Sequence, residues 1–589
     1  MPSGDSMKRV TQSLVKELTL TLRDAFIDYN TRFGQITRRA KRRFEQRDWS
    51  AGRVDAVERI DLYEKCVAAA VAEVAELTGN CEDPQQLLHE ARESYAREIS
   101  GYPDPEFFKT FFNSVTRRIF KTVGVDADVE FVAAEVRPTE YTKNQLDSRV
   151  YRNRGALRYL FDEALTDYSF GVRWRDVERT IRWMTAEIDA YTASLGPMAK
   201  VVSIELMETV FYRSTRAYLV GRIEGNDWVS PLVIALKNSD EGIFADAVIL
   251  SENDVSMLFG FTRSYFHADV SRVSTAVAFI KSILPRKPIA EIYTVLGRAK
   301  QGKTERFRSL DLHMQNSTDK FIFARGDKGM VMEVFTLPSI PLVFKLIRDK
   351  FAYPKDIVRQ DVLDKYRLVF HHDRAGRLID AQEFRRLEFD RDRFEDDLLE
   401  SLLTSCSQTC VLEGDKLVIK HSYLERRLAP LNLYLQEAEP DQVRAAAIDY
   451  GQAIRDLAFS NIFAGDLLLK NFGVTRHGRV IFYDYDELCL VTECNFRRLP
   501  EARDDVDEMR SGAWFYVGPD DIFPEQFVRF LGFREDAREA FLEHHGDLLD
   551  PDFWIRLKRR LETGQSPEVI PYQPKQWSEV AGPGHFVTR

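Results

Sequence analysis

The chain has 589 residues, of which 44% are hydrophobic and 30% are charged, and its formal net charge at pH 7 is −10. This composition is typical of a globular protein, and the acidic balance argues against a protein that binds nucleic acid. No segment approaches the roughly 20 apolar residues of a membrane-spanning helix, and the first residues contain no apolar signal core. The six cysteines include no Cys-x-x-Cys pair, which predicts reduced thiols and a cytoplasmic location.

Residues 8–193 show mostly the period of amphipathic helices, which predicts a helical first part of the chain. One helix is expected over Ala51–Leu77, with Ser50 as its N-cap. The basic run Thr37–Arg43 is expected to be the solvated face of an earlier helix. The apolar side of the helix over Ala51–Leu77 is predicted to comprise Val54, Val57, Ile60, Cys66, Val67, Val71 and Val74.

Strands are expected next, at Tyr218–Ile223 and Leu232–Leu236, where apolar and β-branched residues predominate. The segment Gly297–Thr304 has two interpretations. Its glycine N–H groups and its lysines could bind an anion, or it could be a basic linker that leads to the next domain.

The segment Ala324–Phe335 contains two glycines and then an alternating apolar strand. Glycine allows backbone N–H groups to approach a phosphate closely, although an ordinary hairpin turn has the same composition. Lys345 lies within the apolar strand Leu342–Ile347, like the kinase lysine that contacts the α- and β-phosphates. The alternative is an exposed edge-strand lysine, but the flanking apolar residues would bury its stem. A strand at Leu417–Leu424 then leads into a helical pattern at Asn432–Leu435, as in the hinge where kinases hold adenine.

The most informative motif lies further on, where Asp466 and Asn471 are five residues apart and Asp484 follows thirteen residues later. Phosphoryl transfer needs a carboxylate that orients the attacking hydroxyl, and an amide and a second carboxylate that hold Mg²⁺. A strand, an Arg-His-Gly turn and the apolar strand Val480–Tyr483 are predicted to bring Asn471 and Asp484 to one metal. Each motif alone could arise by chance or form a surface turn. Together with the upstream segments they predict a kinase-like centre, while G-x-G-x-x-G and P-loop motifs are missing from the sequence.

Six further stretches are long, ordered and collinear. They are Phe111–Val115, Gly260–Phe266, Gly329–Met332, His372–Arg374, Asn471–Val480 and Phe482–Glu487. With these stretches the chain resembles, over nearly its whole length, the isocitrate dehydrogenase kinase/phosphatase family. This family comprises bifunctional bacterial enzymes that control flux into the glyoxylate bypass.

The resemblance implies an α+β fold, with a mainly helical regulatory domain containing a few strands at residues 1–315 and a bilobal protein-kinase-like domain at residues 316–589. The N-lobe would span residues 316–425 and the C-lobe residues 426–589. A serine of isocitrate dehydrogenase would be phosphorylated and dephosphorylated at one site, with ATP or ADP and Mg²⁺ required for both activities. AMP is the expected allosteric effector, with Gly297–Thr304 as its candidate site. The expected assembly is a homodimer that binds neither nucleic acid nor membranes.

The resemblance also assigns site residues. Residues 324–330 would be the ATP-binding loop, and Lys345 the lysine that contacts ATP. Asp380 matches an active-site aspartate of the family, although the residues alone would place it on the solvated face of a polar helix. Glu383 is a candidate partner for Lys345, because kinases pair this lysine with a glutamate of the following helix. The loop comprises Ala324, Arg325, Gly326, Asp327, Lys328, Gly329 and Met330.

Two departures from ordinary protein kinases bear on mechanism. The His-Arg-Asp motif is replaced by Ala-Gly-Asp, which ends at Asp466, so activity should not depend on an arginine that reads a phosphorylated activation loop. The Asp-Phe-Gly motif becomes Asp-Tyr-Asp, with Asp486 in place of the glycine. Asp486 could orient water or tune the metal for phosphate removal, or it could merely cap the turn that follows.

These residues predict a division of roles. We expect Asp466 to orient the serine hydroxyl and Lys470 to offset charge on the transferring phosphoryl group. Asn471 and Asp484 are the predicted Mg²⁺ ligands, and Lys345 is expected to steady the nucleotide.

Two other functions compete with this hypothesis. A phosphotransferase acting on a small metabolite would share the Asp-x4-Asn motif, but the large helical first part of the chain argues against it. A binding protein on an inactive kinase scaffold would have lost a metal ligand or the lysine, and all of them are present. The charged and aromatic segment Arg348–Arg367 could grip the partner enzyme or form a solvated helix.

Overall fold

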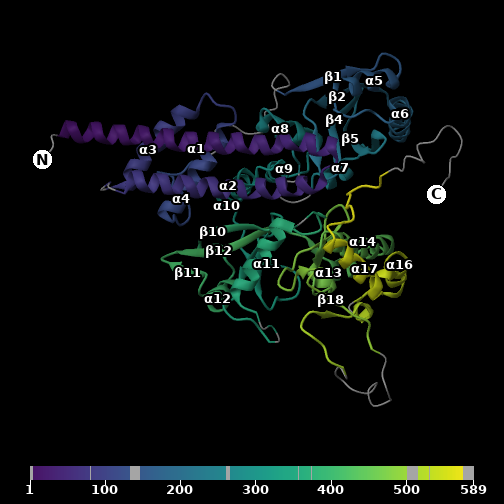
Figure 1. Ribbon diagram of the computed structural model, residues 1–589. Coiled ribbons are helices and arrows are strands. Elements are labelled where there is room, and N and C mark those ends of the chain that lie inside the picture. The colour runs from purple at the N-terminus through teal and green to yellow at the C-terminus, as the bar shows by residue number, and fades with distance from the viewer. Residues whose placement is uncertain are drawn as a thin grey trace. The chain divides into compact units, whose positions relative to one another are not determined.

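The computed structural model describes residues 4–79, 81, 83–132, 146–260, 266–353, 355, 357–372, 374–500, 515–529 and 531–574. The chain divides into two compact units. One comprises Met1–Gln315 together with Pro571–Arg589, and the other comprises Asn316–Ile570 (Figure 1). Within the family-specific stretches, residues 261–265 and 373 lie outside the described residues.

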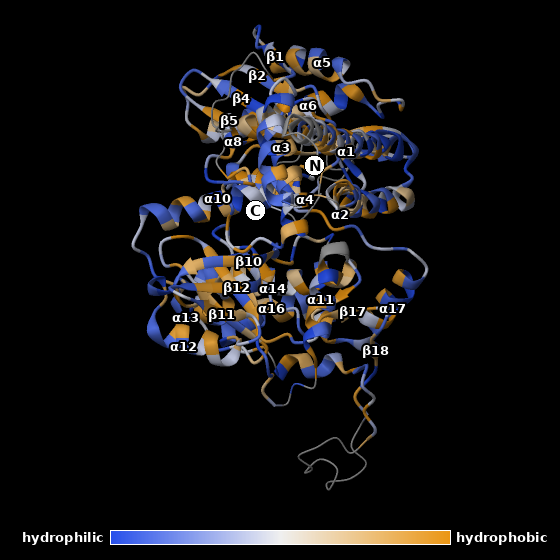
Figure 2. Ribbon diagram, turned by 90° about the vertical axis from the view of Figure 1, so that its left-hand side faces the viewer, coloured by the Kyte–Doolittle hydropathy of each residue, from blue (hydrophilic) through white to orange (hydrophobic). Residues whose placement is uncertain are grey.

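The first unit begins with long helices that pack side by side (Figure 1). They are α1 (Gly4–Gln46), α2 (Trp49–Thr78), α3 (Pro84–Ile99) and α4 (Pro105–Phe120), followed later by α5 (Leu157–Asp167) and α6 (Val177–Ser194). Figure 2 shows both hydrophobic and hydrophilic residues on α1 and α2, as expected for amphipathic helices. Among the described residues, no helix combines the length and the apolar composition that crossing a membrane requires.

The start of α2 corrects the sequence prediction by two residues. Asp48, not Ser50, is the N-cap, and its carboxylate accepts a hydrogen bond of 3.1 Å from the backbone N–H of Ala51. Val54, expected on the apolar side, is 66% exposed, whereas Asp55 is buried. The helix face is rotated because Asp55 accepts hydrogen bonds from Arg43 of α1 at 2.8 Å and from its neighbour Arg39 at 3.0 Å.

The same contacts correct the prediction for the basic run of α1. Arg39 also binds Glu58 of α2 at 2.7 Å, and Arg38 binds Asp269 at 3.2 Å. Part of this basic run therefore forms ion pairs with neighbouring elements and is not a solvated face, because carboxylates of α2 lie within hydrogen-bond distance of its arginines.

A six-stranded antiparallel sheet completes the first unit, which makes this unit richer in strands than expected. Its order is β1-β2-β4-β5-β6, with β3 paired to β4. The predicted strands at residues 218–223 and 232–236 are confirmed and are longer than predicted. The strands are β1 (Ser148–Arg152), β2 (Val201–Met207), β3 (Phe211–Arg213), β4 (Arg216–Gly225), β5 (Val229–Ser239) and β6 (Gly242–Ile249).

Both faces of this sheet are buried. Tyr218 and Val220 of β4 pack into one hydrophobic cluster with α1 to α4, while Leu219 and Ile223 pack into a second cluster with α5 and α6. Burial on both faces explains why β4 and β5 are almost continuously apolar. Four further helices follow: α7 (Glu252–Leu258), α8 (Val273–Ile283), α9 (Ile289–Val295) and α10 (Ala299–Asn316).

The described end of the chain belongs to the first unit, whereas we expected residues up to 589 in the catalytic domain. Tyr572 packs against the helical core of the first unit, and its hydroxyl donates a hydrogen bond of 3.2 Å to Asp246 of β6. Burial of this aromatic ring and its hydrogen bond fix the returning segment there.

The second unit begins with a six-stranded antiparallel sheet of order β10-β12-β9-β8-β7, with β11 paired to β12. The predicted strand Leu342–Ile347 is confirmed as β9. The strands are β7 (Ile322–Phe323), β8 (Met332–Thr336), β9 (Leu342–Ile347), β10 (Gln382–Asp390), β11 (Cys410–Glu413) and β12 (Lys416–Arg426). Helices α11 (Arg359–His372) and α12 (Asp396–Ser405) and the 3₁₀ helix η2 (Arg391–Arg393) accompany them.

The rest of the second unit is mainly helical around Trp554, which is fully buried. Its α-helices are α13 (Leu431–Glu437), α14 (Pro440–Phe459), α16 (Glu535–His545) and α17 (Pro551–Glu562). Its 3₁₀ helices are η3 (Leu469–Asn471), η4 (Pro524–Arg529) and η5 (Gly546–Leu549). Short strands complete it: β13 (Ala429–Pro430), β14 (Ile462–Phe463), β15 (Phe472–Val474), β16 (Val480–Phe482), β17 (Cys489–Leu490), β18 (Asn495–Phe496) and β19 (Asp521–Ile522).

Candidate active site

The predicted hairpin between Asn471 and Asp484 is present as β15 and β16. Phe472 pairs with Phe482, and Gly478 in the connecting turn has a φ of 75°, a conformation that favours glycine. The backbone N–H of Tyr483 donates a hydrogen bond of 3.1 Å to the carbonyl of Asn471. The open end of the hairpin therefore places Asn471 next to Asp484.

A buried arginine fixes this hairpin to helix α14. Arg377 donates hydrogen bonds of 2.6 and 2.8 Å to Asp449, and one of 2.8 Å to Asp456. It also donates to the carbonyl of Val480 at 2.9 Å, and Asp449 accepts a hydrogen bond of 2.6 Å from the N–H of Val480. Burial opposes ionisation of Asp449, but the charge of Arg377 outweighs it and keeps the pKa of Asp449 below its usual value.

The loop that carries Asp466 depends on a glycine. Gly465 has a φ of 76°, and a Cβ atom there would lie 2.3 Å from the carbonyl oxygen of Glu487. The loop can therefore pass directly against the segment that follows the hairpin. Asp466 Oδ1 accepts a hydrogen bond of 3.0 Å from the N–H of Leu468, and the amide of Asn471 donates one of 3.4 Å to the carbonyl of Asp466.

Lys345 is buried, and its charge is balanced by a residue that the sequence analysis did not select. Its Nζ lies 2.8 Å from Glu425 Oε2 and donates a hydrogen bond of 2.7 Å to the carbonyl of Tyr483. The expectation that Glu383 pairs with Lys345 is wrong. Glu383 lies on strand β10, not on a helix, and binds Arg385 and His421.

The geometry of the sheet explains the choice of Glu425. In the antiparallel register, Lys345 of β9 is opposite Tyr423 of β12. Residues two apart on a strand share a face, so Glu425 is the diagonal neighbour of Lys345 on that face. The buried lysine therefore finds its carboxylate on the adjacent strand, at the entrance to the hinge.

The predicted nucleotide loop precedes β8. Gly326 has a φ of 122°, which a larger side chain would rarely adopt. A Cβ atom at Gly329 would lie 3.0 Å from the carbonyl oxygen of Met332. Arg325 forms an ion pair with Glu437 of α13, and the ammonium of Lys328 lies 4.3 Å from the ring centre of Phe323.

A cavity of about 510 Å³ brings these segments together. It is lined by the whole predicted nucleotide loop, by Lys345 and Glu425, and by the predicted hinge between β12 and α13. A pocket of this size is in the range that encloses a small organic ligand. From the catalytic segments it is lined by Asp466, Lys470, Asn471, Tyr483, Asp484 and Asp486.

Asp380 is the exception among the predicted site residues. Of the residues that the structure describes, Ile379 lines this cavity but Asp380 does not. Asp380 lies in the extended segment before β10, not in a polar helix, and Gln382 donates a hydrogen bond of 3.1 Å to it. The segment runs beside the hairpin, because Leu378 bridges to Phe482. The catalytic role of Asp380 stays a prediction.

Lys355 lies close to the carboxylates of the Asp-Tyr-Asp segment. Lys355 Nζ lies 2.9 Å from Asp486 Oδ2 and also pairs with Glu487. Burial raises the pKa of Asp484 to about 7, and the charge of Asp486 acts in the same direction, while Lys345 and Lys355 act against it. Two adjacent carboxylates and the amide of Asn471 are a set of oxygen donors that suits Mg²⁺.

Sequence reasoning missed Glu425, Lys355 and Arg377. Glu425 could have been found from one signal. It is a glutamate at the end of an apolar strand, and a buried lysine on a neighbouring strand needs such a carboxylate. Lys355 and Arg377 stand in charged segments without a period, and no local pattern distinguishes them from solvated residues.

Comparison with known proteins gives matches along most of the chain. Residues 319–574 match the family model described as the isocitrate dehydrogenase kinase/phosphatase (AceK) kinase domain, and residues 19–318 match the regulatory domain of the same family. The chain belongs to the isocitrate dehydrogenase kinase/phosphatase family. The predicted family, fold class and class of enzyme are therefore confirmed.

Curated members of the family are similar over nearly their full length. The isocitrate dehydrogenase kinase/phosphatase of Xanthomonas euvesicatoria pv. vesicatoria is 49% identical, covering 93% of this chain and 95% of the relative. That of Xanthomonas campestris pv. campestris is 48% identical, covering 94% and 96%. That of Anaeromyxobacter sp. (strain Fw109-5) is 45% identical, also covering 94% and 96%. These matches do not favour the alternative of a kinase for small metabolites.

Proposed function

We propose that this protein phosphorylates and dephosphorylates a serine of isocitrate dehydrogenase, with ATP or ADP and Mg²⁺, and thereby controls the branch to the glyoxylate bypass. The observation that supports this best is one cavity lined by the nucleotide loop, Lys345, Asp466, Asn471 and Asp484, with a further carboxylate, Asp486, among them. The first five features serve phosphoryl transfer, and Asp486 adds a group that ordinary kinases lack.

For phosphorylation, each group has one task. Asp466 orients the serine hydroxyl and accepts its proton, and Lys470 offsets negative charge on the phosphoryl group in transit. Lys345, held by Glu425, steadies the nucleotide phosphates. Asn471 and Asp484 would hold Mg²⁺, which when bound neutralises charge on the phosphate oxygens.

For phosphate removal, Asp486 orients the water. Its side chain is only 10% exposed and lies in the same cavity, which favours this role over that of a cap for the following turn. We expect Asp486→Ala to lower phosphatase turnover by about 100-fold, the usual weight of a general base, and kinase turnover by less than about tenfold. Both rates are measured by entry and release of labelled phosphate under saturating Mg²⁺. Equal loss of both activities would mean that Asp486 serves only in metal binding. Retained phosphatase activity would refute its proposed role in orienting water.

The experiment that tests the function is transfer of labelled γ-phosphate from Mg-ATP to purified NADP-dependent isocitrate dehydrogenase, followed by a chase with unlabelled ADP and AMP. Label that enters a serine and then leaves would support both activities in one protein. Label that enters and stays would leave only a kinase. If no label enters, the proposed substrate is wrong.

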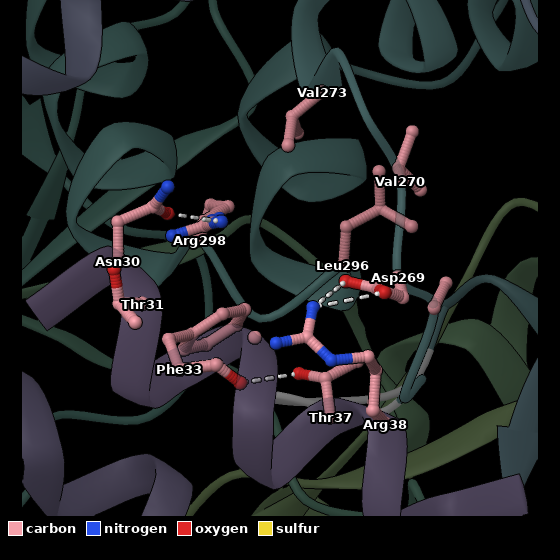
Figure 3. Close-up of a pocket in the computed structure, with 12 residues that line it drawn as sticks. Asn30, Thr31, Phe33, Thr37, Arg38, Asp269, Val270, Val273, Leu296 and Arg298 are labelled. Carbon is pink, nitrogen blue, oxygen red and sulfur yellow. Dashed lines mark hydrogen bonds and ion pairs between the residues drawn. The ribbon is translucent and has the colours of Figure 1, made fainter. Parts of the chain in front are cut away.

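We further propose that AMP regulates the balance of the two activities from a cavity of about 250 Å³ in the first unit. Residues of α1 and the segments around Asp269 and Arg298 line it (Figure 3). Arg298 Nη2 donates a hydrogen bond of 2.8 Å to Asn30, and its guanidinium lies 4.0 Å from the ring centre of Phe33. Among the described residues, Nε and Nη1 of Arg298 are buried without a hydrogen-bond partner.

A second buried guanidinium makes this region attractive to an anion. Burial lowers the pKa of Arg59 to about 9, and the charge of Arg298 acts in the same direction. A bound phosphate would relieve that repulsion. The interpretation of Gly297–Thr304 as a basic linker is wrong, because most of this segment belongs to helix α10. The N–H groups of Gly297 and Gly302 are already bonded to backbone carbonyls.

We expect Arg298→Met to raise the AMP concentration needed for a half-maximal effect about tenfold or more, because a charge-assisted hydrogen bond contributes about 1.5–3 kcal/mol. Kinase turnover without AMP should stay unchanged. Titration of AMP against the phosphatase-to-kinase ratio measures this. Arg286→Met is the control, because Arg286 is an exposed arginine of the same unit that pairs with Glu252. An unchanged AMP response in Arg298→Met would refute the site.

The proposed assembly is a cytoplasmic homodimer, as the resemblance implies. Light scattering of the purified protein at several concentrations decides between monomer and dimer. A constant monomer mass would refute the dimer without affecting the proposed chemistry.

A further inference from the structure

Lys355 lies between β9 and α11 and lines the active-site cavity. Among the described residues of that segment, it is the one that forms an ion pair with Asp486. Its backbone N–H donates a hydrogen bond of 3.1 Å to the carbonyl of Ala352. Its side chain is 10% exposed, like that of Asp486, and its ammonium also pairs with the more exposed Glu487. A lysine held in this way is a fixed part of the cavity wall.

Another cation that lines the cavity, Lys345, is already paired. Lys345 is engaged by Glu425 and by the carbonyl of Tyr483. Asp484 and Asp486 are two carboxylates separated by one residue, and both face the cavity. An unopposed pair of this kind would bind a divalent cation through both members. Because Lys355 pairs with Oδ2 of Asp486, a metal ion has to compete with an ammonium group for Asp486.

We propose that Lys355 is a positioning residue that makes Asp486 a base for water instead of a second metal ligand. This inference rests on the proposed phosphatase role of Asp486. In hydrolysis, the water oxygen forms the new bond to phosphorus and a water proton passes to the carboxylate of Asp486. The bond between phosphorus and the serine oxygen breaks, and that oxygen takes up a proton carried by Asp466.

The consequence is that Lys355 should matter for phosphate removal and much less for phosphorylation. Without its ammonium, Asp486 is free to turn toward Mg²⁺. We therefore expect Lys355→Met to lower phosphatase turnover by about ten- to a hundredfold, while kinase turnover stays within about threefold. Isothermal titration calorimetry of Mg²⁺ with the ADP-bound protein should give a dissociation constant at least about threefold lower than that of the unmodified protein.

Three further variants make the test decisive. Lys355→Arg keeps the charge and should recover most of the lost phosphatase turnover, which a purely structural role would not predict. The double variant Lys355→Met/Asp486→Ala should be no worse than Asp486→Ala alone, because the lysine acts through that carboxylate. Lys416→Met is the control, since Lys416 is a lysine of the same unit whose side chain is 45% exposed and pairs with Asp390, and its loss should leave both activities and the Mg²⁺ affinity unchanged.

Each failure has its own signature. Equal loss of both activities in Lys355→Met, unchanged phosphatase turnover, or weaker Mg²⁺ binding would overturn the inference while leaving the role of Asp486 intact. If Asp486→Ala alone lowers both activities equally, the proposed role of Asp486 fails and the inference fails with it. Thermal unfolding of each variant, compared with that of Lys416→Met, separates these outcomes from loss of fold.

Discussion

Asp466→Ala is expected to lower kinase turnover by about 100- to 1,000-fold, because it removes the carboxylate that we propose orients the serine hydroxyl and accepts its proton. Asp466 lines the cavity that Lys345, Asn471 and Asp484 also line, and its Oδ1 accepts a hydrogen bond from Leu468. The carboxylate is thus held by its own loop. Transfer of labelled γ-phosphate to isocitrate dehydrogenase measures the loss under saturating Mg-ATP.

The position of Asp466 offers a matched control. Asp441, in the first turn of α14, is an aspartate of the same unit that stands on an exposed surface. Asp441→Ala should keep normal turnover. Binding of a fluorescent ATP analogue should change little in Asp466→Ala, because its loss affects the transfer step. Near-normal kinase turnover in Asp466→Ala would refute the proposed mechanism.

Arg377→Met is expected to destabilise the second unit by about 3–5 kcal/mol, because it removes the counter-ion of Asp456, whose side chain is 10% exposed, and of the half-buried Asp449. Arg377 is 3% exposed and binds both carboxylates as well as the carbonyl of Val480. Its loss should also loosen the hairpin that carries Asp484. Chemical denaturation measures the first effect, and amide hydrogen exchange in β15 and β16 measures the second.

Arg385→Met is the control for this prediction. Arg385 of β10 also pairs with a carboxylate, that of Glu383, but its side chain is 65% exposed. Pairs of this kind contribute about 0–1 kcal/mol, so the control should unfold almost normally. Equal stability of Arg377→Met and Arg385→Met would show that the buried network does not hold the hairpin.

The elements nearest the chemistry were predictable because their signals are local. Strand β9 is an uninterrupted apolar run around Lys345, and the hairpin of β15 and β16 is two apolar segments around a turn glycine, Gly478. Alternation and turn composition are properties of a few neighbouring residues, so the sequence alone could place Asn471 and Asp484 together. The fixed spacing of Asp466, Asn471 and Asp484 likewise defined the reaction class before any fold was known.

Side-chain partners were decided only by the tertiary structure. Lys345 pairs with Glu425 because the register of β9 and β12 makes them diagonal neighbours, whereas the nearer candidate Glu383 lies on another strand. Lys355 meets Asp486 in the same way, through segments that are distant along the chain. The partner of a charged side chain depends on which strands and loops pack together. The periodic pattern of one segment does not indicate which other segment will pack against it. The sequence alone therefore determined the reaction class and the candidate residues, while packing decided which charges lie beside them.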